Sequence, residues 1–307
     1  MTDASFACQA EPGLPEDHLL AGYAVPASGY DEMCSASGVL RPHWRELAKT
    51  LESIGGVELE RRHNEVQRLL QADGVTYNTY DDPQGSLRRW LVDTVPLLMT
   101  GEEWSGLAAG LAQRSRLLNA LLADLYGPRT AIREGWLPPE LIFSHPGFLP
   151  ACHRSLPEGR RWLIFHGVDL ARGPDGVIRA YGDRAQSPSG AGYTLENRII
   201  LARALPMIYR DAPLRRLASF LETERATLAR LAPHHPENPH VVLLTPGPSS
   251  PVYFEHAYLA NYLSLSLVEG EDLVVRDGRV WLKTLGGLRP VDVIMRRVAD
   301  PLCDPLE

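Results

Sequence analysis

The sequence of 307 residues is long enough to bury a sizeable core and to divide into two lobes. It is 44% hydrophobic and 22% charged with a formal net charge of -7, which disfavours nucleic acid as the main partner because phosphate backbones attract clustered positive charge. No apolar run reaches the roughly 18 residues of a membrane span, and the N-terminus lacks the pattern of a secretory signal. We therefore expect a cytoplasmic protein that binds neither nucleic acid nor membrane.

The usage of cysteine and lysine narrows the chemistry. No CxxC pair is present, which fits a reducing compartment and disfavours a zinc site. The four cysteines are Cys8, Cys34, Cys152 and Cys303. The chain has only two lysines, Lys49 and Lys283. Genomic base composition explains this shortage, yet it also leaves few lysines for binding phosphate.

The first third of the chain predicts an extended arm followed by helices. Residues 1–35 are rich in Pro, Gly, Ser and Ala without a period, which is typical of an arm. Apolar spacing predicts helices over residues 40–54 and 57–72, the second ending at Gly74. The stretch "GVTYNTY" predicts a strand, and "RRWLVDTVPLL" a segment that enters the core.

A long helix is expected to begin after Thr100, because Thr100 and Glu103 have the spacing of a capping box. The stretch "YGP" at 126–128 ends it. Its leucines indicate packing rather than chemistry, namely Leu107, Leu111, Leu118, Leu121, Leu122 and Leu125.

The stretch "GPDG" at 173–176 predicts the turn of a β-hairpin, since Pro presets φ and the last Gly accepts a positive φ. If Arg172 faces Val177, Asp169 lies opposite Ala180. Gly167 then lies opposite Gly182. Side chains alternate between the two faces of a hairpin, so one face carries Asp169, Gly182 and Arg184, and His166 meets Asp183 on the other. A register error of one residue would exchange these faces.

The remainder predicts two helices and a compact α/β unit. The helices span residues 193–205 and 214–231, and the polar linker "PHHPENP" follows them. The α/β unit is expected to contain the strand "HVVLLT", the loop "PGPSSP", the helix "VYFEHAYLANYL", the strand "LSLVEG", a hairpin turning at Asp277-Gly278 and the strand "VDVIMRR".

Several long motifs in one order resemble the circularly permuted ATP-grasp proteins. They are "GVTYNTY", "GVDLARGPDG", "SPSGAGYTLENR", "LLTPGPSSPVYFEHAYLA", "DLVVRDGRVWLKTLGGL" and "VDVIMRR". The likeness runs from about Leu40 to the last residue. The chain resembles relatives of the glutathionylspermidine-synthase-type ligases. Within them, it is most similar to the subgroup in which this region precedes a helical alpha-E domain.

The resemblance implies a mixed α+β (α/β) fold that is an incomplete ATP-grasp fold. Its expected parts are an arm (1–35), a helical and mixed region (36–160), the ATP-grasp hairpin with its PSG loop and helix layer (161–235), and a truncated Rossmann-like unit (239–307). The resemblance also implies that the family's chains continue past "CDPLE" with the rest of the ATP-grasp core. We therefore expect this chain to be the N-terminal part of a longer protein, with that remainder and an alpha-E domain as partners.

The activity that the resemblance implies is ATP-dependent carboxylate–amine ligation, with ATP and Mg²⁺ as cofactors and a small-molecule or peptide carboxylate as substrate. In such enzymes ATP phosphorylates the carboxylate and an amine attacks the acyl phosphate, so metal ions that neutralise phosphate charge are needed. The runner-up is a non-catalytic nucleotide- or peptide-binding module of a larger protein.

The expected metal site departs from the family pattern. Asp169 fits the first metal ligand, but Gly182 and Arg184 stand where the family has Glu and Asn. An arginine cannot ligate a metal, and beside Asp169 it is expected to form a bidentate ion pair. Arg184 then contacts phosphate directly, or fills the metal position in a fold that binds without catalysis, or only stabilises the strand end. Asp169 and Arg184 are the candidate catalytic residues.

The remaining candidate residues lie in two loops and near them. Small residues before a helix present N–H groups to an anion, although Ser189 would also serve as a plain helix cap. Asn197 and Arg198, one to two turns inside the helix, fit a structural role as well as a role in the site. The candidate nucleotide contacts are Gln186, Ser187, Ser189, Gly190, Asn197 and Arg198. The candidate substrate contacts, near strand ends of the α/β unit, are Thr245, Gly247, Glu269 and Arg296. Glu255 and His256 are interpreted as helix-face residues.

Overall fold

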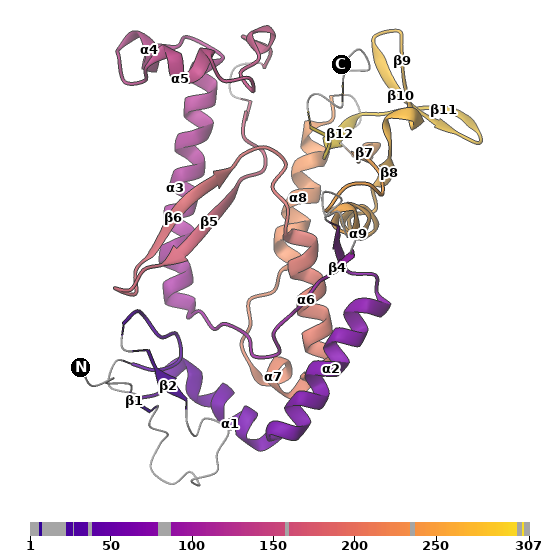
Figure 1. Ribbon diagram of the computed structural model, residues 1–307. Coiled ribbons are helices and arrows are strands. Elements are labelled where there is room, and N and C mark those ends of the chain that lie inside the picture. Colours follow the sequence, from indigo (N-terminus) through magenta and orange to yellow (C-terminus); the bar gives the residue numbers. More distant parts are fainter. Residues whose placement is uncertain are drawn as a thin grey trace. The chain divides into compact units, whose positions relative to one another are not determined.

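A computed structural model describes residues 6–7, 23–26, 28–35, 39–78, 87–156, 160–233, 237–299 and 303 (Figure 1). The chain forms two compact units. The first contains Phe6–Ala7 and the stretches Leu20–Trp44 and Leu97–Pro188, and the second contains Arg45–Pro96 and Ser189–Glu307. The predicted regions 36–160 and 161–235 each contribute to both units.

The first unit is built on the long helix α3 (Gly101–Leu125). The Thr100 side chain accepts a hydrogen bond from the Glu103 backbone N–H at 3.1 Å, which confirms the predicted helix start. Of the six predicted core leucines only Leu125 is buried, and the other five are half-buried. Three short helices follow α3, namely α4 (Thr130–Arg133), α5 (Pro139–Phe143) and the 3₁₀ helix η2 (Pro150–Cys152).

A two-stranded antiparallel hairpin, β5 (Gly167–Arg172) and β6 (Ile178–Arg184), lies alongside α3 (Figure 1). An isolated two-stranded hairpin is marginal, and polar contacts tie this one down at its tip. Arg172 donates to Glu103 of α3 at 2.6 Å and to Glu32 at 2.5 Å. Its guanidinium also lies 4.8 Å from the Tyr30 ring centroid.

The predicted hairpin register is wrong, although the predicted faces are correct. Gly176 has φ +79°, and the Gly173 N–H donates to the Val177 carbonyl. The turn therefore closes one residue later than expected, and Arg172 pairs with Ile178. Farther along, Leu170 pairs with Ala180 and Asp169 with Gly182, so Tyr181 forms a β-bulge. The later turn and the bulge each shift the register by one residue. Together they shift it by two, so each side chain lies on the face that was predicted for it.

Smaller elements complete the first unit. They are β1 (Phe6–Ala7), β2 (Ala24–Val25) and the 3₁₀ helix η1 (Pro42–Trp44). Cys34 is fully buried and disulfide-bonded, which the scattered cysteines had not suggested. Cysteine usage therefore no longer argues for a reducing compartment. The predicted arm lies largely outside the described residues.

The helical part of the second unit contains α1 (Arg45–Ile54), α2 (Gly56–Ala72), α6 (Ala191–Ala204), α7 (Pro206–Asp211) and α8 (Ala218–Leu231), with the strand pair β3 (Thr76–Asn78) and β4 (Leu87–Arg89). Helix α2 ends before Gly74, whose φ is +69°, as predicted. Residues of α2 and α6 form the core with Val75 and Leu205, and the most deeply buried are Val66, Leu70, Ile200 and Leu205. Helix α7 was not predicted.

The α/β part of the second unit has a parallel sheet in the order β12-β7-β8. Strand β7 (Val241–Leu244) leads through α9 (Tyr253–Leu263) to β8 (Ser266–Val268), and β12 (Val293–Arg296) pairs on the other side of β7. After the 3₁₀ helix η3 (Gly270–Asp272), an antiparallel sheet contains β9 (Leu273–Arg276), β10 (Arg279–Thr284) and the unpredicted β11 (Gly287–Pro290).

The mixed helix-and-sheet fold class is confirmed. Among the described residues, no helix is both long enough and apolar enough to cross a membrane.

Leu70→Ala should lower the free energy of unfolding by about 2–5 kcal/mol, because it leaves a cavity in the α2–α6 core. Leu70 is 1% exposed, whereas Val57 on the same helix is 88% exposed. Val57→Ala is therefore the matched control and should change the free energy by less than about 0.5 kcal/mol. Urea unfolding followed by tryptophan fluorescence measures both variants. Equal effects would contradict the described packing.

Candidate functional site

One face of the hairpin carries an ion pair between Asp169 and Arg184. Asp169 of β5 lies directly opposite Gly182 of β6, and Arg184 lies two residues farther along the same face. The Arg184 Nε is 3.1 Å from Asp169 Oδ1 and 3.0 Å from Oδ2, so one N–H is shared between both carboxylate oxygens. The Arg184 side chain is 64% exposed. The ion pair that the sequence predicted is therefore present.

Gly182 makes room for this ion pair. A Cβ placed on Gly182 would lie 2.9 Å from Asp169 Oδ2, closer than ordinary contacts allow. A side chain at position 182 would thus displace the Asp169 carboxylate from its present place. Gly182 and Arg184, which replace the expected metal ligands, therefore both contribute to the ion pair: Gly182 leaves space for the Asp169 carboxylate, and Arg184 donates to it.

The residues at this face do not fit a divalent metal in the described arrangement. Among the described residues of β5 and β6, Asp169 is the only carboxylate on this face, and Arg184 Nε lies near both of its oxygens. Among the described residues, no group of three or more His, Cys, Asp or Glu side chains has a geometry that holds a metal ion. Mg²⁺ therefore stays an expectation from the resemblance.

The opposite face ties the hairpin to α3 through Asp183. Its carboxylate accepts hydrogen bonds from Arg114 Nε at 2.6 Å and Nη2 at 2.5 Å. His166 Nε2 lies 2.9 Å from the same carboxylate, as the predicted faces required, and His166 Nδ1 lies 2.7 Å from Ser115 Oγ. The hydrogen bonds from Arg114, and secondarily that from His166, lower the pKa of Asp183 to about 2.

The N-terminus of α6, at the end of the loop 186–190, already binds a carboxylate of the protein. Glu255 Oε1 accepts hydrogen bonds from the N–H groups of Gly190 at 2.7 Å and Gly192 at 2.9 Å, so a protein carboxylate already occupies the N-terminus of α6. Gly190 rather than Ser189 is the cap residue, with φ +120°. A second anion there would meet the Glu255 charge. Gln186 and Ser187 are exposed residues of the first unit.

Two further candidate nucleotide contacts, Asn197 and Arg198, make contacts within the protein. A structural role for both residues was the alternative that the sequence left open. Asn197 Oδ1 accepts a hydrogen bond from Trp90 Nε1 at 2.9 Å. Arg198 donates to the Arg215 carbonyl at 3.2 Å and lies over the Tyr209 ring. These contacts support the scaffold alternative for both residues, and a nucleotide contact by either stays a prediction.

The four predicted substrate residues lie at the carboxyl edge of the parallel sheet, where open α/β sheets bind ligands. Thr245 and Gly247 follow β7, Glu269 follows β8, and Arg296 ends β12. Gly247 has φ +87°, and a Cβ there would lie 2.7 Å from Glu269 Oε2, so the loop needs a glycine to approach Glu269. The Thr245 hydroxyl accepts the Gly247 N–H at 3.2 Å.

A cavity of about 670 Å³ opens at this edge, a size typical of small-molecule sites. Its polar wall contains Thr245, Ser249 and Glu269, and strands β9, β10 and β12 provide an aliphatic wall. Arg296 contacts Cys303, which also lines the cavity, with Nη1 3.7 Å from Sγ. The arrangement suits a ligand that has both polar and aliphatic parts.

Glu255 and His256, interpreted from sequence as helix-face residues, are buried at 1% and 2% exposure. His256 Nδ1 lies 2.9 Å from Thr245 Oγ1, beneath the loop that follows β7. Burial, with a smaller effect of the nearby Arg297 charge, lowers the pKa of His256 to about 4. The neutral ring and the Thr245 hydroxyl thus share a buried hydrogen bond. A charged and a polar residue side by side in the largely apolar stretch "YFEHAYLANYL" were the available signal for both residues.

Comparison with known proteins supports the resemblance read from the motifs. The profile described as "Circularly permuted ATP-grasp type 2" matches residues 96–307. The chain belongs to the circularly permuted ATP-grasp family. The likeness to glutathionylspermidine-synthase-type ligases and the alpha-E subgroup remain predictions.

Similar curated proteins are uncharacterised and longer. A Mycobacterium tuberculosis protein (strain H37Rv) is 41% identical over 325 residues, which cover 99% of this chain and 37% of the relative. A Synechocystis protein is 37% identical, covering 91% of this chain and 58% of the relative. A second M. tuberculosis protein is 33% identical, covering 95% and 53%. The ATP-grasp chain thus spans between 37% and 58% of the length of these relatives.

The buried His256 of this ATP-grasp chain should make its stability depend on pH. Its pKa of about 4 lies below the ordinary value of 6.5, so the unfolded chain binds a proton that the folded chain excludes. The contribution is complete above pH 6.5 and is lost as the pH falls from 6.5 to 4. The loss is on the order of 2–3 kcal/mol.

Unfolding free energies measured between pH 7 and 4 test this dependence. His256→Gln should lose this part of the pH slope, while His153→Gln, at an exposed histidine, should retain it. A slope that is unchanged in His256→Gln would contradict the assignment of His256 as a buried neutral base.

Proposed function

We propose that this chain is the N-terminal part of an ATP-dependent carboxylate–amine ligase that acts on a small-molecule or peptide carboxylate. Membership of the ATP-grasp family supports ATP-dependent ligation. The observation that carries the proposal to this chain is the cavity at the carboxyl edge of the β12-β7-β8 sheet, with Thr245, Ser249 and Glu269 on its polar wall. In this proposal the cavity holds the substrate to be ligated.

The loop after β7 would orient the substrate. Gly247 brings the backbone close to Glu269, and the hydrogen bonds of Thr245 to Gly247 and His256 hold the loop in that conformation. A rigid loop of this kind reduces the entropy lost when substrate and nucleotide are brought together. Thr245, Gly247, Glu269 and Arg296 are the proposed substrate residues.

Arg184 is the proposed phosphate contact. When bound, ATP supplies the phosphoryl group that activates the carboxylate. The largely exposed Arg184 side chain lies on the hairpin face, where it would neutralise phosphate charge in place of a metal ligand. Its partner Asp169 would hold it in position. Gln186 and Ser187 follow on the same unit, and the rest of the nucleotide site is proposed to come from the remainder of the longer protein.

A second candidate function is a non-catalytic module that binds a nucleotide or peptide. The Asp169–Arg184 ion pair favours it, since the arginine covers the carboxylate that a catalytic metal would need. The two candidates differ in one respect, which is whether bound ATP is consumed.

Trapping with hydroxylamine distinguishes the two functions. The complete protein is incubated with ATP, hydroxylamine and a panel of amino acids, peptides and dicarboxylic acids. A ligase is expected to form a hydroxamate together with an equal amount of ADP, because hydroxylamine replaces the amine. Glu269→Gln should reduce this rate by roughly 10-fold or more if it removes a charged hydrogen bond to the substrate. ATP binding without ADP formation across the panel would reject the ligase and favour the binding module.

A further inference from the structure

We infer that Arg114 and His166 are positioning residues that select the register of the hairpin, and that this register is what places Arg184 against Asp169. The inference rests on the proposed function only where it concerns phosphate binding by Arg184. The register itself follows from the first unit alone.

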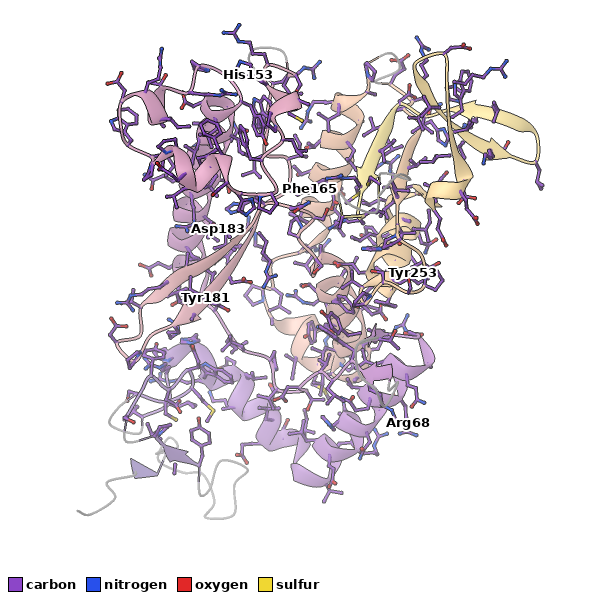
Figure 2. The ribbon with its side chains drawn as sticks, turned by 45° about the horizontal axis from the view of Figure 1, so that its top comes forward. Arg68, His153, Phe165, Tyr181, Asp183 and Tyr253 are labelled. Atoms are coloured by element: carbon purple, nitrogen blue, oxygen red, sulfur yellow. The ribbon has the colours of Figure 1, made fainter. Side chains whose placement is uncertain are left out.

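The bulge at Tyr181 decides which side chains share a face with Asp169. Between the turn and the bulge, Arg172 pairs with Ile178 and Leu170 with Ala180. If that register continued without a bulge, Asp169 would pair with Tyr181. Paired residues lie on one face and alternate residues follow them, so Asp183 would join Asp169 while Gly182 and Arg184 turned towards α3. Tyr181 and Asp183 are labelled on the hairpin in Figure 2.

The alternation of side chains therefore allows two registers of the hairpin, which differ in the charged residue beside Asp169. In the bulged register the neighbour is Arg184, and the face has no free carboxylate. In the register without the bulge the neighbour is Asp183, and two carboxylates share the face. Nothing in the alternation of side chains prefers one register over the other, because each places a continuous set of residues on each face.

Helix α3 supplies the preference. Arg114 donates two hydrogen bonds to Asp183, a geometry that is both strong and directional. His166, whose other nitrogen lies 2.7 Å from Ser115 of the same helix, adds a third contact to the carboxylate. These contacts are possible only while Asp183 faces α3. The register without the bulge would replace them with Arg184 facing Arg114, two like charges.

The contacts at the hairpin tip do not duplicate this role. Arg172 ties the tip to Glu103 and Glu32, but it lies on the turn side of the bulge. A bulge can therefore form or disappear without disturbing it. Arg114 and His166 act on the segment beyond the bulge, so they are the residues that determine where Arg184 points.

The register is measured directly by nuclear Overhauser contacts of Gly182 in the 307-residue chain, with selective labelling of glycine, aspartate and valine. The wild type should show Gly182 opposite Asp169. The Arg114→Gln, His166→Gln double variant should show Gly182 opposite Val168. Arg116→Gln, at an exposed arginine of the same helix, should keep the wild-type contacts. Persistence of the Asp169–Gly182 contact in the double variant would overturn the inference.

A second, more conservative variant tests the inference if the double variant does not fold. Asp183→Asn keeps the shape of the side chain and removes only the charge that Arg114 binds. It should populate both registers, seen as two sets of Gly182 resonances. A single wild-type set in a folded Asp183→Asn chain would also overturn the inference.

Binding of ATP to the complete protein, in a double-mutant cycle with Arg184→Gln, tests the link to the proposed function. Asp183→Asn and Arg184→Gln should each weaken binding by roughly 10-fold, and the combined variant should be no weaker than Arg184→Gln alone. Additive losses would contradict a role of Asp183 through Arg184. If the register changes but the affinity for ATP does not, the register inference stands and phosphate contact by Arg184 is rejected.

Discussion

The ion pair between Asp169 and Arg184 is the interaction on which the account of this ATP-grasp chain depends. It covers the carboxylate of the hairpin face that a metal would need, and it places a largely exposed arginine side chain there instead. Gly182 permits it by leaving space for the carboxylate, and the Tyr181 bulge brings Arg184 to the correct face. The chemistry proposed for the hairpin follows from these three local features.

The sequence predicted most elements of the fold because local rules determine them. Capping at Thr100, the turn at "GPDG" and the glycine after α2 are set by residues close together in the chain. The hairpin register was not predictable in the same way. A three-residue turn and a one-residue bulge each shift the register, and no local pattern shows where a bulge forms. The predicted faces were nevertheless correct because the two shifts add to an even number.

The contacts of Glu255 could not be predicted because they join distant parts of the chain. Its carboxylate meets Gly190 and Gly192, 65 and 63 residues earlier, and takes the N–H groups that a local reading reserved for phosphate. The sheet edge was predicted more successfully, since the ends of parallel strands meet at one edge whatever the detailed packing. His256 shows the limit of that success, because only the structure places it under Thr245.

The magnesium dependence of ATP binding tests the central claim, that Arg184 takes the place of a metal ligand. The measurement is calorimetric titration of ATP, with and without magnesium, into the complete protein and into a Gly182→Glu, Arg184→Asn double variant. Wild-type binding should not depend on magnesium, and the variant should gain such a dependence because it regains oxygen ligands beside Asp169. Wild-type binding that requires magnesium would contradict the central claim.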